Sequence, residues 1–284
     1  MQVYEDFGKA GYSLTDYHEK WMTPNGLGEM AVEDTRSFSG GRFHLSAVPF
    51  QTGSDVGVDD HRKYLAVSTH TFPVPHDGTL VLFCTGQVFD WFIASDTAFA
   101  LIERLPTVVT GNVGNPDCGA TTEVGLSKMY TQIIREVPLP AEQWHHLDIA
   151  LSRHDGEAWV DYFLDHQLIA HVEKIGIPLD KQGVPFTGIY TSVGDGELVA
   201  GQLDSVRFGH GLFSLLDAFP FQHPEAPDLS ISIPVGDASG RGAAGRARLF
   251  GQGAGGSFGN FTTLTITGPA GRSDIVSALA AARS

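Results

Sequence analysis

Two carboxylates stand where a β-strand would place them among apolar side chains. In the run 98–105, alternation of side chains puts Glu103 on the same face as Phe99 and Leu101. Asp90 alternates in the same way with apolar neighbours near the end of the preceding run. A carboxyl group in apolar surroundings has a raised pKa and can act as a general acid or base. The alternatives are an ion pair or a solvated strand end for Glu103, and a capping role for Asp90.

Further candidates for chemistry lie upstream of this pair. His70 and Tyr64 share a face of the run 64–74, and imidazole is the natural proton-transfer group near neutral pH. A lone strand histidine is nevertheless more often structural. Trp91 would serve either as a stacking surface for a ligand or as a core residue. We predict Glu103, His70, Asp90 and Tyr64 as catalytic residues, and Trp91, His61, Arg104 and Tyr190 as substrate-binding residues.

The sequence patterns that resemble cofactor or metal sites lack the structural setting that such sites require. The segment 251–256 matches Gly-x-Gly-x-x-Gly, but the run 257–266 reads as loop and strand. A dinucleotide site would need a following helix within a βαβ unit. His145 and His146 are adjacent, so in a strand they point to opposite faces and cannot chelate one metal as a simple pair. We therefore expect no cofactor and predict no metal-binding residues.

Composition limits the classes of partner. The net charge of −15 leaves no broad basic face, so we expect no nucleic-acid partner. No apolar run is long enough to cross a bilayer, so we expect no membrane partner. The two cysteines, Cys84 and Cys118, are expected to be free thiols. The first residues lack the basic and apolar regions of a secretory signal, which leads us to expect a cytoplasmic location.

Strand signals dominate the chain. Short runs rich in Val, Ile, Thr and Phe alternate with period two between turn residues. The expected strands are 64–74, 79–93, 98–105, 128–137, 144–153, 157–164, 168–173, 186–193, 198–208, 229–235, 247–251 and 261–267. His76-Asp77-Gly78 predicts a tight hairpin between the first two.

This pattern predicts an all-β fold, an antiparallel β-sandwich of jelly-roll type with few short helices. Helices are expected only at 213–219 and 273–282. We expect one sandwich domain over 1–270 and a tail, 271–284, that is helical or disordered.

A resemblance supports this fold class. Trp144-His145, a strand ending at Arg153, the turn Asp155-Gly156, Tyr162-x-x-Asp165 and the run 201–208 resemble the laminin-G-like pattern. The similarity covers roughly 140–210 and points to the concanavalin A-like lectin/glucanase superfamily. One departure is Asp165-His166, where the pattern usually has Asp-Gly. The segments 89–92, 103–106 and 248–253 also resemble uncharacterised bacterial members of that superfamily.

What the resemblance implies about activity is narrow, because a fold does not determine a function. Endoglucanases of the superfamily carry Glu-x-Asp-x-x-Glu on one strand face, and this chain has no such run. The resemblance therefore argues against standard glucanase chemistry. By analogy it permits a structural calcium ion, with Asp6 and Asp204 as candidate ligands.

Three functions remain open. The first is a cytoplasmic enzyme acting on a small organic molecule by cofactor-independent acid–base chemistry, of lyase, isomerase or cyclase type, in a pocket on the concave sheet. The second is a non-catalytic module that binds a carbohydrate or another small ligand, with Trp21, Trp91 and Trp159 as stacking surfaces. The third is a structural protein whose edge strands pair in a homo-oligomer.

Overall fold

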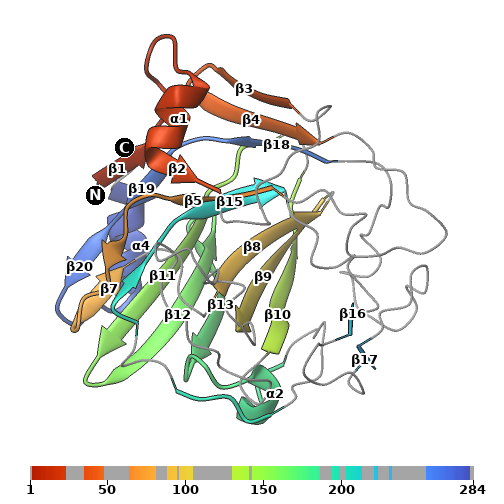
Figure 1. The fold of residues 1–284 in the computed structure, drawn as a ribbon. Helices are drawn as coiled ribbons and strands as arrows, with labels where there is room; N and C mark the ends of the chain where they lie inside the picture. Colours follow the sequence, from red (N-terminus) through yellow and green to blue (C-terminus); the bar gives the residue numbers. More distant parts are fainter. Residues whose placement is uncertain are drawn as a thin grey trace. The chain divides into compact units, whose positions relative to one another are not determined.

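The computed structural model confirms an all-β protein built from antiparallel strands (Figure 1). It describes residues 2–23, 35–47, 64–80, 88–94, 96–104, 130–140, 143–185, 194–198, 203–212, 221–222, 230–231 and 254–281. Helices in these segments are α1 (Leu14–Lys20), α2 (Leu179–Gln182) and α4 (Arg272–Ala281). The chain forms two compact units. Unit 1 comprises Met1–Tyr4, Ser68–Phe208 and Phe261–Ser284, and unit 2 comprises Glu5–Val67 and Gly209–Asn260.

Unit 1 is built on two main sheets. One has the strand order β13-β12-β11-β7-β20 and the other the order β10-β9-β8. Two short pairs, β1-β19 and β14-β6, complete the unit. The strands are β1 (Gln2–Glu5), β6 (Phe72–Pro73), β7 (Gly78–Leu80), β8 (Val88–Ala94), β9 (Thr97–Arg104), β10 (Tyr130–Pro138), β11 (Leu147–His154), β12 (Glu157–Leu164), β13 (Gln167–Glu173), β14 (Ser205–Val206), β19 (Phe261–Thr263) and β20 (Thr265–Thr267).

The two main sheets of unit 1 form successive layers. The Tyr162 hydroxyl on β12 donates a 2.7 Å hydrogen bond to the carbonyl oxygen of Leu101 on β9. The Trp91 indole on β8 donates to the carbonyl oxygen of Asp148 on β11 and packs edge-on against Tyr162. Side chains between the layers are buried, and they include Phe89, Ala98, Ala100, Ile102, Val160 and Val172. These contacts join β8 and β9 to the five-stranded sheet.

The outer face of the five-stranded sheet is covered by α4. Ile275 and Leu279, one helical turn apart, pack against Ala150 and Phe163. The tail for which the sequence permits a helix is thus helical over Arg272–Ala281. Its buried positions attach it to β11 and β12.

Unit 2 contains the sheets β18-β4-β3 and β15-β5-β2, the pair β16-β17 and the helix α1. Its strands are β2 (Trp21–Met22), β3 (Thr35–Ser39), β4 (Arg42–Ala47), β5 (Tyr64–Ser68), β15 (Gly209–Leu212), β16 (Phe221–Gln222), β17 (Ser230–Ile231) and β18 (Ala254–Phe258). Its aromatic core centres on Tyr17, Trp21, Phe43 and His210. Burial lowers the pKa of His210 to about 3, so this imidazole is neutral.

Several expected elements agree with the structure, and one expected turn is wrong. β12 has the limits read from the sequence, and β18 shows that the glycine motif ends in a strand and not a helix. The hairpin at Gly78 does not form, because β6 pairs with β14 whereas β7 pairs with β11 and β20. Gly78 has φ 141°, and a Cβ there would lie 2.2 Å from the Ile266 carbonyl oxygen. The glycine serves this close strand pairing, not a chain reversal.

Other expectations fall outside the described residues. They are the strands 186–193 and 247–251, the helix 213–219, and both cysteines.

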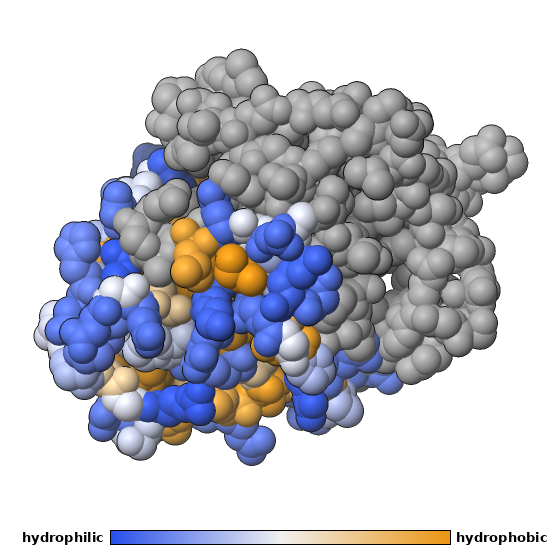
Figure 2. All heavy atoms as spheres, turned by 90° about the horizontal axis from the view of Figure 1, so that it is seen from below, coloured by the Kyte–Doolittle hydropathy of each residue, from blue (hydrophilic) through white to orange (hydrophobic). Residues whose placement is uncertain are grey.

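The surface is largely polar where it is described. On the face drawn in Figure 2, hydrophilic residues surround small apolar areas. No helix in the described segments is both long and apolar enough to cross a membrane.

Candidate functional site

The two carboxylates singled out from the sequence lie on one face of the β8–β9 pair. Asp90 is opposite Leu101, and Glu103 is opposite Val88. Because side chains alternate along a strand, Asp90 and Glu103 are diagonal neighbours on the same face. Diagonal partners in an antiparallel pair are roughly 7–8 Å apart, within reach of one small bound molecule.

The described neighbours of this pair on the same face are apolar. Phe99, Leu101 and Ile133 on the same face are essentially inaccessible to solvent, and Glu103 is only 3% exposed. Asp90 is partly buried. Burial raises the pKa of Asp90 from 3.8 to about 7, because the charged form loses hydration. Asp90 is therefore close to half-protonated at neutral pH.

Trp91 lies on the opposite face of β8 and packs against the five-stranded sheet, and its predicted role in substrate binding stays a prediction. Its ring lies 5.8 Å from that of Tyr162, and its indole nitrogen is engaged by the Asp148 carbonyl oxygen. Burial is the main cause that raises the pKa of Tyr162 well above its usual value, and the charge of Asp90 is the second cause. Trp21 is buried in the unit 2 core at 1% exposure, so it cannot serve as a stacking surface. Its predicted role in glycan binding is wrong.

The remaining predicted site residues are His70, Tyr64, Arg104, His61 and Tyr190. His70 is exposed, and its ring packs edge-on against Tyr4 at 5.8 Å. Only the backbone is described for Tyr64, which begins β5 in unit 2, and for Arg104, which ends β9. His61 and Tyr190 lie outside the described residues. The roles predicted for these residues stay predictions.

A second polar group was missed at the sequence level. Asp161 on β12 is fully buried and holds His171 Nδ1 of β13 at 2.7 Å, with Arg272 Nε at 3.6 Å. His171 Nε2 lies 3.3 Å from Glu173. The hydrogen bond with Asp161 is the first cause of a raised His171 pKa. This network ties β12, β13 and α4 together, because Arg272 begins that helix.

The structure does not test the calcium ligands suggested by analogy. Asp6 Oδ1 accepts a hydrogen bond from the Gly8 amide. In the described part of the chain, no group of three or more His, Cys, Asp or Glu side chains is arranged to hold a metal ion. A calcium site stays a prediction.

The stretch from β7 to β20, which includes Asp90 and Glu103, coincides with a known family model. That model matches residues 79–267 and describes a family of unknown function, DUF6081. The chain belongs to this family. No curated protein matches the chain. Membership of the DUF6081 family carries no activity with it, so function has to be argued from the site.

Proposed function

We propose that this DUF6081 protein catalyses cofactor-independent proton transfer on a small organic molecule, a chemistry of lyase, isomerase or cyclase type. Asp90 is the general base that removes a proton from the substrate. Glu103, on the same strand-pair face, is the general acid that donates its own proton to the substrate, and exchange with solvent restores both carboxyl groups. The observation that carries the proposal is the pKa of Asp90 near 7 beside a second, buried carboxyl. A general base works best when its pKa lies near the operating pH.

The apolar surroundings support this role. Phe99 and Leu101 exclude water from the face that carries both carboxylates, so the ionised form of Asp90 is poorly solvated and basic. The same surroundings favour a substrate with a compact apolar part and a carbonyl group. The carbonyl group makes the C–H bond next to it acidic enough for a carboxylate base.

The proposal also includes the type of β-fold, the location of the protein and its oligomeric state. The antiparallel layers of unit 1 support a concanavalin A-like jelly roll, and the DUF6081 match spans the segment that carries the resemblance. A cytoplasmic location fits an enzyme for a small intracellular molecule. A homo-oligomer that pairs edge strands would be compatible with this function.

The proposal is tested by isotope exchange, which needs no knowledge of the product. The full-length protein is incubated in D₂O with a panel of small ketones, hydroxyketones and hydroxy acids, and loss of C–H signals is followed by proton NMR. We expect at least one compound to exchange faster than in buffer. Asp90→Asn and Glu103→Gln should each slow this exchange by about 100-fold or more.

A matched control separates chemistry from folding. His154→Ala removes a titratable strand side chain that bonds Asp77, away from the β8–β9 face, and should leave the exchange rate unchanged. Melting temperatures of all variants establish that they are folded. Exchange no faster than buffer across the panel, or full exchange in folded Asp90→Asn, would contradict the proposal.

A further inference from the structure

The sheet β18-β4-β3 of unit 2 presents one face lined with hydroxyl groups. His44 on β4 is opposite Ser37 on β3 and Ser257 on β18. Ser46, two residues further along β4, is opposite Gly255. These positions share a face because side chains alternate along each strand. The aromatic side chains of β3, β4 and β18 pack on the other face (Phe38, Phe43 and Phe258).

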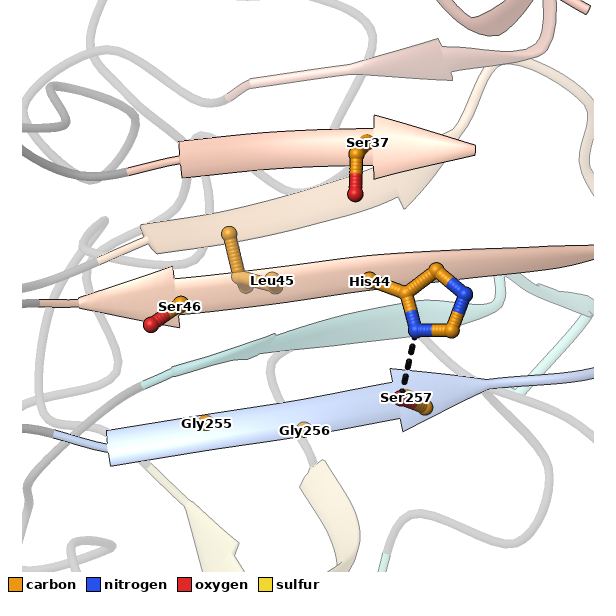
Figure 3. A pocket seen from close by; sticks show the side chains of 7 residues that line it. All are labelled: Ser37, His44, Leu45, Ser46, Gly255, Gly256 and Ser257. Atoms are coloured by element: carbon orange, nitrogen blue, oxygen red, sulfur yellow. Dashed lines mark hydrogen bonds between the residues drawn. The ribbon is translucent and has the colours of Figure 1, made fainter. Parts of the chain in front are cut away.

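This face is hollowed (Figure 3). The hollow has a volume of about 360 Å³, within the range of small-molecule sites. It is lined by Ser37, His44, Leu45, Ser46, Gly255, Gly256 and Ser257. Apart from the imidazole, none of these lining side chains is ionisable. The hollow therefore suits a small uncharged molecule with polar atoms.

Gly255 keeps the floor of the hollow bare. Its backbone is not left-handed, and the nearest atom to an added Cβ would be the Leu45 carbonyl oxygen at 3.9 Å, an ordinary contact. Glycine weakens a strand, so neither backbone geometry nor crowding explains this residue. A strand glycine often marks a bulge, a tight bend or a close approach to the backbone, and the β18–β4 pair has no register shift, which favours close approach here.

His44 is held on both ring nitrogens. Its Nδ1 lies 2.7 Å from the Ser257 hydroxyl (Figure 3). Its Nε2 lies 2.9 Å from the Ser39 hydroxyl and 3.3 Å from the Ser39 carbonyl oxygen. A carbonyl oxygen can only accept, which assigns the ring proton to Nε2. In the neutral ring Nδ1 is then an acceptor, and the Ser257 hydroxyl donates to it.

We propose that Ser257 is a nucleophile activated by His44, and that the hollow accepts a small, uncharged carboxylic ester. A nucleophile hydrogen-bonded to a base, with the base oriented by a third group, is the signature of covalent catalysis. Ser257, His44 and Ser39 have these three relations. The Ser37 and Ser46 hydroxyls line the same hollow and orient the ester carbonyl.

The chemistry balances without a cofactor. Ser257 Oγ attacks the ester carbonyl carbon while its proton passes to His44 Nδ1, and the positive ring is held by Ser39. The alcohol leaves as the carbon–oxygen bond breaks and takes the proton from Nδ1. Water then repeats both steps on the acyl-serine, with His44 again accepting and returning the proton. The products are the acid and free Ser257.

The test uses diisopropyl fluorophosphate, a compact uncharged reagent for activated serines, on the full-length protein. Intact mass spectrometry should show one adduct, and peptide mapping should place it on Ser257. Hydrolysis of p-nitrophenyl acetate, followed by absorbance, should exceed that in buffer and be lost after labelling.

Four variants make the test specific. Ser257→Ala should abolish both signals, and His44→Gln should slow labelling by about 100-fold. Gly255→Val should fill the hollow and suppress labelling without lowering the melting temperature, because valine favours a strand. His154→Ala, another partly buried strand histidine, should label like the unaltered protein. Absent labelling, labelling of other serines, or equal rates in His44→Gln would overturn the proposal.

Discussion

Asp90, which is partly buried, and Asp161, which is fully buried, both lie in the sheets of unit 1, but their surroundings give them different roles. Apolar neighbours raise the pKa of Asp90 to about 7, which suits proton transfer. Asp161 instead holds His171 and lies near Arg272, while its Oδ2 has no hydrogen bond from the described residues. A carboxylate committed to such partners is a structural group. We therefore assign chemistry to Asp90 and anchoring to Asp161.

The cost of removing the Asp161 charge should depend on pH in a defined direction. Asp161 raises the His171 pKa, so its stabilisation is complete below pH 6.5 and fades as the pH rises through the folded-state value. We expect Asp161→Asn to cost about 3 kcal/mol at pH 6, as for other broken buried ion pairs. The cost should be smaller at pH 9. Urea unfolding at both values measures it, and equal losses would contradict this assignment.

At the scale of elements, two consecutive hairpins differ in their turn residues. The β11–β12 turn has Asp155 and Gly156 at φ 51° and 83°, and the β12–β13 turn has Asp165 and His166 at φ 48° and 68°. Both need left-handed backbone at two positions, as in type I′ turns. His166 adopts this conformation without being glycine, at a cost of roughly 1 kcal/mol.

Exchanging turn residues should therefore shift stability in opposite directions. Gly156→Ala should destabilise the protein by about 1 kcal/mol, because alanine is strained at this φ. His166→Gly should stabilise it by about 0.5 kcal/mol, which is the relieved strain less the lost stacking of His166 on His146. Urea unfolding checks both. A destabilising His166→Gly would show that the imidazole contact outweighs the backbone strain.

The helix α4 is attached by a few apolar side chains. Ile275→Ala and Leu279→Ala should each cost about 2–5 kcal/mol, because both side chains are buried against Ala150 and Phe163. Ser277→Ala, on the exposed side of the same helix, is the matched control and should change stability by less than about 0.5 kcal/mol. Thermal unfolding distinguishes them. A loss at Leu279 no larger than at Ser277 would mean that the helix does not contribute to the core.

Local patterns were sufficient to predict some elements and could have revealed others. Alternation predicted β12 and the apolar neighbours of Glu103 within β9, whereas the face that Glu103 shares with Asp90 follows only from the pairing of β8 with β9. The helix α1 was missed, although Ser13-Leu14-Thr15-Asp16 is a capping-box signal and both of its hydrogen bonds form. The β3–β4 hairpin was also missed, although Gly40-Gly41 favours such a turn.

Other contacts could not have been predicted from the sequence. A register shift between Tyr162 and Phe163 brings His171 opposite Asp161, whereas the unshifted hairpin would pair Asp161 with Ala170. One extra residue reverses the faces of all that follow, and no residue type signals it. The His44–Ser257 contact joins strands 213 residues apart, so it depends on strand order.

At the scale of the whole molecule, each unit is assembled from separated segments. β20 pairs with β7 across nearly two hundred residues, and β18 pairs with β4. The DUF6081 match covers segments of both units, but it begins after β4 and β5 in the chain. The Asp90–Glu103 face therefore lies within the matched family region, whereas the His44 side of the hollow lies outside it.

The free energy of unfolding of the whole protein should depend on pH because of Asp90. Its folded-state pKa exceeds the ordinary 3.8, so folding retains a proton, and stability falls as the pH rises from about 4 through 7. Asp90→Asn removes this dependence. We expect the variant to match the unaltered protein near pH 3.5 and to exceed it at pH 8 by up to about 4 kcal/mol. Urea unfolding at both pH values measures the difference in stability between the two proteins. A less stable variant at pH 8 would count against a desolvated Asp90.

The most direct test of the proposed proton transfer is the titration of the Asp90 carboxyl itself. The protein is labelled with carbon-13 at the aspartate side-chain carboxyl, and the Asp90 signal is assigned by its disappearance in Asp90→Asn. The account predicts a midpoint near pH 7. A midpoint near the ordinary value of 3.8 would show that Asp90 is a solvated surface acid, and the proposed general base would have to be abandoned.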